Sequence, residues 1–211
     1  MKRWFGIAAI LLGGLLLAGC SQPDSNAETP NVNKNLSVLV PEYTELSKIR
    51  LPNGRRYVSL GDTEEKANAV FPRPSRAFTL LEEIVPGLPN DFRGKGWDSS
   101  TEGFGVILHD DKIVLAMHQY EGIEPDEFAS ILENIKAING LDHFQSVTQD
   151  KAEYWFTKFG PDVLSISRLP TLKRRYQVTI TIGNEHLLDS LGILKDVKKI
   201  DNLPNSEKHV Q

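Results

Sequence analysis

Cysteine is almost absent from this chain: Cys20 is the single one among 211 residues. One cysteine cannot form a disulfide within the chain or supply the several thiolates of a structural zinc site or an iron–sulfur cluster. Long apolar runs are also lacking. The longest, Phe5–Ala18, has about 14 residues, whereas a helix that crosses a bilayer needs roughly 20. The folded part must therefore be stabilised by packing alone, and the apolar run predicts a segment that is cleaved off.

Positive charge is also in short supply. The chain has 24 Lys and Arg against 28 Asp and Glu, a formal net charge of −4. Residues 1–19 contain Lys2 and Arg3 and no acid, so the remainder has 24 − 2 = 22 basic against 28 acidic residues, a formal charge of −6. A mildly acidic protein is a poor candidate for binding nucleic acid. We therefore expect no nucleic-acid partner.

Motifs of known catalytic or metal chemistry are missing as well. The sequence contains no Gly-x-Ser-x-Gly elbow and no His-Glu-x-x-His helix. His109 and His118 flank two aspartates, but a hairpin with its turn at the aspartates separates the histidines by roughly 20 Å, too far for one metal ion. We therefore predict no catalytic residue, no cofactor and no metal site, and a protein that is not an enzyme.

The N-terminus has the layout of an export signal. Lys2 and Arg3 are followed by the apolar run Phe5–Ala18 and by small residues before Cys20. Leu17-Ala18-Gly19-Cys20 resembles the bacterial lipobox, the motif of lipoprotein signal peptides. The resemblance implies cleavage before Cys20 and acylation of its thiol and amine, which makes Cys20 the lipidation site.

An acylated Cys20 would anchor the protein to a membrane, because each buried CH₂ contributes about 0.8 kcal/mol. Ser21, not aspartate, follows the cysteine. In a cell with two membranes, the sorting rule of lipoproteins then implies the outer membrane, with the protein facing the periplasm. Otherwise the anchor implies the outer face of the cytoplasmic membrane. The alternative is an ordinary signal peptide, which would leave Cys20 as a free thiol.

Composition divides the chain into five segments. Residues 1–19 form the signal peptide, and residues 20–35, rich in Ser, Asn and Pro, form a lipidated N-terminus with a flexible tether of about 20 Å reach. Residues 36–140 contain a helix–helix–hairpin–helix unit. Residues 141–195 contain a three-stranded meander with a C-terminal helix, and residues 196–211 form a charged tail.

The start of the first unit is predicted from its turn residues and caps. Residues 42–54 contain a Pro-Asn-Gly turn and are typical of an irregular segment. A strand over 56–60 precedes a helix over 63–70, for which Asp62 is the expected cap. A second helix is expected over 75–84.

The hairpin over 103–109 and 112–118 is the clearest in the chain, with its turn at Asp110-Asp111. An amphipathic helix over 124–139 follows, with Gly140 suited to its C-terminal cap. Counting outward from the turn pairs Leu108 with Ile113, Val106 with Leu115 and Phe104 with Met117.

The second unit is predicted to contain strands over 152–159, 163–169 and 175–182. Alternation in the last strand gives it one wet face, which includes Thr179 and Thr181. The fold class is therefore α+β: antiparallel hairpins and a meander, with amphipathic helices packed on one face. Both units place a helix after a hairpin, so two similar sub-domains are one reading, and a shared core is the other.

Four residues form a candidate interaction surface: Trp155, Phe159, Arg174 and Arg175. Alternation places Trp155 and Phe159 on one face of the strand over 152–159. Either this strand is central and covered on both faces, which we favour, or that face is a contact surface for a partner. Arg174 and Arg175 lie in a basic cluster, which is either a solvated loop or a contact with an anionic partner.

Residues 56–122 show a second resemblance. Gly61-Asp62-Thr63 precedes a short helix, Phe71-Pro72-Arg73-Pro74 ends it, and a second helix and a hairpin follow. In this order, and behind a lipobox, the segment resembles the BamE-like (SmpA/OmlA) lipoproteins and the wider β-lactamase-inhibitor-like fold. The resemblance implies a two-helix, three-strand module that binds other proteins and is not an enzyme.

The sequence therefore predicts a lipid-anchored, non-enzymatic lipoprotein of the bacterial cell envelope. It would bind a protein partner or support envelope assembly, with the membrane contacted through the lipid on Cys20. The alternative function is a ligand-binding carrier or an enzyme that uses a cleft between the two sheet regions.

Overall fold

The computed structural model of the protein describes residues 42–71, 91–98, 101–149, 151–171, 175–191 and 209–210. The signal peptide, Cys20, the tether, the helix expected over 75–84, Arg174 and most of the tail lie outside these residues. Among the described residues, no helix is long and apolar enough to cross a bilayer.

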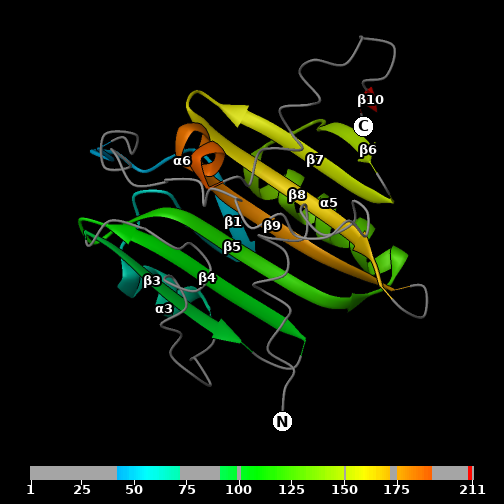
Figure 1. Ribbon diagram of the computed structural model, residues 1–211, viewed down its shortest axis with the longest axis horizontal. Helices are drawn as coiled ribbons and strands as arrows, with labels where there is room; N and C mark the ends of the chain where they lie inside the picture. Colours follow the sequence, from blue (N-terminus) through cyan, green and yellow to red (C-terminus); the bar gives the residue numbers. More distant parts are fainter. Residues whose placement is uncertain are drawn as a thin grey trace, which may run out of the picture.

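The centre of the fold is one antiparallel sheet of eight strands, in the order β10-β6-β7-β8-β9-β5-β4-β3 (Figure 1). A separate hairpin of two strands packs beside it. The mixed α+β class is confirmed, with strand predominating. The strands are β1 (Arg50–Asn53), β2 (Arg56–Ser59), β3 (Phe92–Asp98), β4 (Glu102–His109), β5 (Lys112–Ile123), β6 (Gln145–Gln149), β7 (Ala152–Phe159), β8 (Asp162–Pro170), β9 (Tyr176–Asn184) and β10 (His209–Val210). The helices are α3 (Glu64–Val70), α5 (Pro125–Asn139) and α6 (Glu185–Ser190).

The strands of the two predicted units belong to this single sheet. β5 from the first unit pairs with β9 from the second, from Leu115 opposite Gly183 to Ile123 opposite Tyr176. β5 extends five residues beyond the strand expected over 112–118, and this extension supplies much of the pairing. The boundary at residue 140 therefore separates segments of the chain, but it does not separate two sheets.

The two faces of the sheet are covered by different elements (Figure 1). The β1–β2 hairpin, α3 and α5 cover one face, where Phe128 and Ile135 of α5 join the larger core. α6 covers part of the other face with Leu187 and Leu188. The expectation that the helices pack on one face is therefore wrong for α6. The short α6 follows β9 directly and buries its leucines on the face where Gly183 leaves room.

The β4–β5 hairpin has the expected turn and a different register. Asp110 and Asp111 both have positive φ, 48° and 59°, as a two-residue type I′ turn requires. Leu108 lies opposite Ile113 as predicted, but the register then shifts, so that Leu115 lies opposite Ile107. The predicted pairs Val106–Leu115 and Phe104–Met117 are wrong, because Val106 pairs with Ala116 and Phe104 pairs with His118.

A bulge at Val114 explains this shift. Consecutive residues of a strand normally face opposite sides of the sheet, but Val114 and Leu115 are both buried in the smaller core, whereas Ile113 is buried in the larger one. Beyond the bulge every side chain of β5 changes face relative to the prediction. His118 is thereby turned into the larger core, opposite Phe104.

The ends of α5 and α6 follow local sequence signals. Glu124 and Glu127 form the capping box of α5, and Gly140 adopts the left-handed conformation after its last turn. Asn184 caps α6 by accepting a hydrogen bond from the backbone N–H of His186 at 3.0 Å.

The cap expected for α3 is wrong by one residue. Thr63 is the cap, whereas Asp62 accepts a hydrogen bond from the backbone N–H of Ser59 at 2.8 Å. The segment 42–54, predicted to be irregular, contains β1, and the prediction also omitted β3, β6 and, in the charged tail, β10. β1 pairs only with β2, in a two-stranded hairpin. Pro52 has no backbone N–H to donate, and in so short a ladder this loss interrupts no larger sheet.

Replacing Gly183 by alanine is expected to destabilise the protein by about 2 kcal/mol, since overpacking a buried site costs roughly 1–3 kcal/mol. A Cβ atom at Gly183 would lie 2.8 Å from Cδ2 and 2.9 Å from Cγ of Leu188, which is fully buried. Urea unfolding measures the loss. Gly105→Ala is the matched control, because its Cβ would meet only the Lys95 carbonyl at 3.6 Å. Equal stabilities of the two variants would contradict this packing argument.

Candidate functional site

Four hydroxyl side chains form a square on two adjacent strands, which we call the hydroxyl patch. Ser165 and Ser167 of β8 lie opposite Thr181 and Thr179 of β9, respectively. Successive members of each strand are two residues apart, so all four side chains project from one face. The intervening Ile166 and Ile180 belong to the core on the other face. The patch therefore lies on the face that also carries α6.

The square is extended on both sides by the neighbouring strands. On β5, Gln119 lies opposite Thr179 and Met117 opposite Thr181. On β7, Tyr154 lies opposite Ser167, and Phe156 opposite Ser165. Two parallel rows thus cross four strands: one contains Gln119, Thr179, Ser167 and Tyr154, and the other contains Met117, Thr181, Ser165 and Phe156.

Two polar atoms in the first row are buried without a hydrogen-bond partner in the described part of the protein. They are Oε1 of Gln119 and Oγ1 of Thr179, on side chains of residues only 3% and 5% exposed. The Nε2 of Gln119 donates to Oε1 of Glu121 at 3.5 Å. An unsatisfied buried acceptor or hydroxyl costs about 1–3 kcal/mol. These two atoms thus mark a position where a further polar group would be bound favourably.

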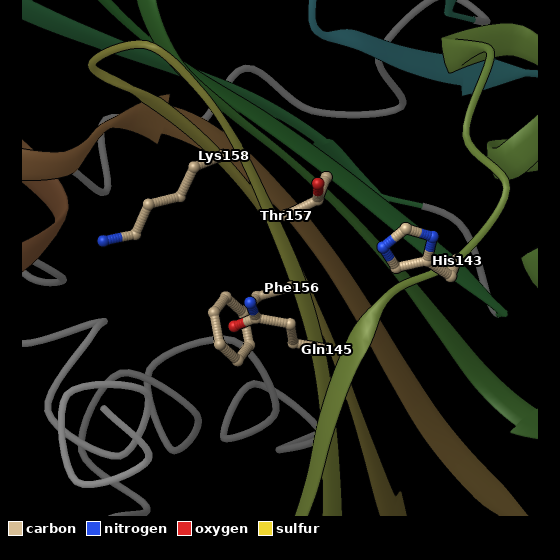
Figure 2. A pocket seen from close by; sticks show the side chains of 5 residues that line it. All are labelled: His143, Gln145, Phe156, Thr157 and Lys158. Atoms are coloured by element: carbon tan, nitrogen blue, oxygen red, sulfur yellow. The ribbon is translucent and has the colours of Figure 1, made fainter. Parts of the chain in front are cut away.

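A hollow of about 300 Å³ lies where the second row meets the edge of the sheet. Its lining residues come from β7 and from the start of β6 and the loop before it: His143, Gln145, Phe156, Thr157 and Lys158 (Figure 2). Gln145 lies opposite Phe156 in the ladder, so the hollow is contiguous with the row that contains Ser165. Lys158 extends away and binds Oε1 of Glu185 at 2.7 Å. Phe156 and Gln145 therefore form the part of the hollow that adjoins the patch.

Of the residues proposed from sequence as an interaction surface, Trp155 and Phe159 pack in the larger core, Arg175 is exposed, and Arg174 lies outside the described residues. Trp155 is 3% exposed and lies in the core against Phe128, with ring centroids 4.9 Å apart. Phe159 is half-buried and packs against the same core. Arg175 is exposed and pairs with Oε1 of Glu124 at 3.3 Å. Trp155 is therefore a core residue, and β7 has a buried side chain on each face, Trp155 on one and Phe156 on the other.

Arg168, which lies near the basic cluster in the sequence, is held within the fold. Its guanidinium lies over three rings, 4.5 Å from the centroid of Phe128, 4.6 Å from that of Tyr176 and 5.4 Å from that of Trp155. It also pairs with Glu153, directly opposite in the β7–β8 ladder. Stacking on three rings and pairing with a carboxylate hold this arginine within the fold. Arg168 is therefore a packing residue.

The beginning of the described chain is fastened to the β7–β8 turn by a carboxylate. Asp162 is buried and accepts two hydrogen bonds, from the Tyr43 hydroxyl at 2.8 Å and from the Ser47 hydroxyl at 2.5 Å. Burial, and then the adjacent Asp162 charge, raise the pKa of Tyr43 well above its usual value, so the phenol remains a donor. We call this arrangement the clasp; it ties the segment that follows the predicted tether to the sheet.

His118 is the most deeply buried titratable side chain near the β4–β5 hairpin. It is 1% exposed and packs against the rings of Phe71, Phe104 and Tyr120. Burial lowers its pKa to about 4, an effect that the Pro52 carbonyl only partly opposes. The imidazole is therefore neutral at pH 7.

The carboxylate beside His118 does not reverse this effect. Glu102 Oε2 lies 3.6 Å from Nε2 of His118, but the Glu102 side chain is 47% exposed and therefore hydrated. Burial, and secondly Glu102, raise the pKa of Tyr120 above its usual value. Within the described ranges, no group of three or more metal-ligating side chains occurs.

Sequence alternation alone indicated only one strand of the hydroxyl patch. Thr179 and Thr181 were expected on a wet face, but both are buried. Ser165 and Ser167 alternate with buried residues in the same way. Both strands thus alternate, but the prediction used only the alternation in β9, and the pairing of the two strands depends on a register that the sequence does not specify.

Comparison with known proteins gives little further information. No protein-family model and no curated protein matches the chain. A cysteine-rich secretory protein from Staphylococcus aureus is similar in structure with a TM-score of 0.33 and 11% sequence identity. The similarity covers 61% of this chain and 46% of that protein, so the chain spans about half of its length. A likeness of this size carries no argument about fold or function.

Proposed function

We propose that this protein is a lipid-anchored, non-enzymatic binding module of the bacterial cell envelope. The lipobox-like stretch Leu17-Ala18-Gly19-Cys20 carries the proposal, with Cys20 as the lipidated residue. The clasp supports it, because Asp162 ties the chain that follows the tether to the sheet. In a cell with two membranes, Ser21 directs the protein to the outer membrane, facing the periplasm; otherwise the protein lies on the outer face of the cytoplasmic membrane.

The partner that we propose is an envelope protein, in line with the resemblance to BamE-like lipoproteins. The order of α3, β3, β4 and β5 supports that resemblance. The outer side of β6 supports a protein partner. β10 pairs there only with Gln145 and Ser146, and no described strand pairs with residues 147–149 on that side. An extended partner segment would pair with the backbone of these three residues.

The alternative function needed a cleft between two sheet regions. Direct pairing of β5 with β9 closes that position among the described strands. A carrier or an enzyme would therefore need its site at another position in the fold.

Cys20→Ser is expected to move the protein from the membrane fraction to the soluble fraction, because it removes the acyl anchor. Fractionation of cells that express the full chain, followed by mass spectrometry of the N-terminus, measures this change. Ser21→Asp is the matched control: it retains the lipid and, in a cell with two membranes, shifts the protein to the inner membrane. Retention of the Cys20→Ser variant in the membrane fraction would contradict the anchor.

The protein partner is tested with a photo-crosslinking amino acid at Thr148, an exposed position of β6. Ala137, exposed on α5, is the control position. We expect a crosslink to a defined envelope protein from Thr148 and none from Ala137. Identical crosslinking patterns at the two positions would contradict a role of the β6 edge.

A further inference from the structure

We infer that the hydroxyl patch and the adjoining hollow form a binding site for a neutral saccharide. The first argument is the chemistry of the patch. Each Ser and Thr hydroxyl offers one donor and two acceptor positions, and the Gln119 amide offers both kinds of group. Sugar hydroxyls require the same mixture of donors and acceptors. A grid of such groups on a sheet face resembles the way in which strands of small β-folds bind oligosaccharides.

The second argument is the buried, unpaired polar atoms. Oγ1 of Thr179 and Oε1 of Gln119 belong to residues at least nine-tenths buried, and they face the same side of the sheet on directly paired strands. Buried polar groups are nearly always hydrogen-bonded, so each exception requires an explanation. A ligand hydroxyl placed between these two atoms would donate to Gln119 and exchange a hydrogen bond with Thr179.

The third argument is the absence of charge among the members of the two rows. Their side chains are hydroxyls, one amide, one thioether and two aromatic rings. The nearby ions are already engaged: Glu121 accepts from Gln119, and Lys158 pairs with Glu185. An anionic ligand would meet no free cation in the rows, so the complementary ligand is neutral.

The fourth argument is access. Thr179 and Thr181 are buried, whereas Ser165, Ser167 and Tyr154 are only half-buried. The patch is therefore approached from the β7–β8 side, where the hollow of about 300 Å³ adjoins it through Phe156. The Phe156 ring, which lines the hollow, supplies apolar surface at this entrance, against which the C–H groups of a sugar ring pack.

A peptide is a poorer match for the patch. Extended peptides are recognised by backbone pairing at a sheet edge, and amphipathic helices by apolar grooves. The patch lies on the face of four interior strands and is lined by neutral hydroxyls. It is thus distinct from the β6 edge proposed for a protein partner, and each of the two sites can fail without the other.

The site is tested with the lipidated full chain in nanodiscs, titrated with the neutral oligosaccharides chitotetraose and cellotetraose by calorimetry. We expect one of them to bind at a single site. Thr179→Val and, separately, Ser167→Ala are expected to lower its affinity about tenfold, the effect of one lost hydrogen bond. Ser130→Ala on α5 removes a hydroxyl that donates to the Asp126 carbonyl, and it should leave the affinity unchanged.

Stability provides a second readout. Because the Thr179 hydroxyl is buried and unpaired, Thr179→Val should raise the Tm of the unliganded protein by about 2–4 °C while it weakens binding. The inference is overturned if neither oligosaccharide binds, or if Thr179→Val and Ser167→Ala bind as the parent does. It is equally overturned if dextran sulfate or an uncharged serine-rich peptide binds to the patch in place of the neutral sugars.

Discussion

Replacing Asp162 by alanine is expected to lower the free energy of unfolding by about 3–5 kcal/mol. The buried carboxylate accepts hydrogen bonds from Tyr43 and Ser47, and each hydrogen bond to a charged group contributes roughly 1.5–3 kcal/mol. Both hydroxyls would remain in a partly buried position without their acceptor. Urea unfolding followed by circular dichroism measures the loss.

Tyr43→Phe provides the graded control for the clasp. It keeps the ring and removes one of the two hydrogen bonds, so about half of the Asp162→Ala effect is expected. The segment before β1 should also become more accessible to protease in Asp162→Ala than in the parent protein. An Asp162→Ala variant within 0.5 kcal/mol of the parent would show that the clasp contributes nothing to stability.

The second large effect is a loss of stability in acid that depends on His118. The pKa of the His118 imidazole is about 4 in the folded protein, whereas its ordinary value is 6.5. Between these pH values the unfolded chain binds a proton that the folded protein does not bind. Stability therefore falls as pH is lowered from about 6.5 to about 4. At 1.36 kcal/mol per unit, the total is roughly 3 kcal/mol.

Urea unfolding at pH 7, 5.5 and 4 measures this contribution. His118→Phe, which retains an aromatic ring among Phe71, Phe104 and Tyr120, is expected to remove this part of the pH dependence. His186→Asn is the control, since His186 is exposed. The assignment would be wrong if His118→Phe lost stability between pH 7 and pH 4 as steeply as the parent does.

The parts of the fold that were predicted correctly are those with local signals. α5 is marked by Pro125, by its apolar stripe and by Gly140, all within its own segment. The Asp110-Asp111 turn is likewise determined by two adjacent residues. Such features need no information about distant segments, so their prediction from sequence is reliable.

The errors concern features that a distant segment determines. β3 contains Gly94 and Gly96, which weaken any strand pattern, and its structure comes from pairing with β4. The bulge at Val114 was missed because the alternation in 112–118 fits an unshifted register equally well. The partner of β5 is β9, more than 50 residues away, and no local pattern indicates it.

The candidate site was predicted only in part for the same reason. Alternation correctly placed Trp155 and Phe159 on one face of β7. That this face is buried could not be predicted, because Phe128 of the distant helix α5 packs against Trp155. The hydroxyls of β9 could be recognised from the sequence. Their neighbours on β8 and β5 required the order of the strands in the sheet.

The pairing of β5 with β9 has a consequence for how the chain folds. β3, β4 and β5 form successive hairpins from one edge inward, and β6, β7, β8 and β9 do so on the other side, where β10 is the outermost strand. Each set requires only short loops to close, whereas the β5–β9 seam joins residues as far apart as Leu115 and Gly183. Loop-closure entropy increases with that separation, so the two hairpin arrays are expected to form early and the seam last. The middle of the finished sheet is thus the final part to assemble.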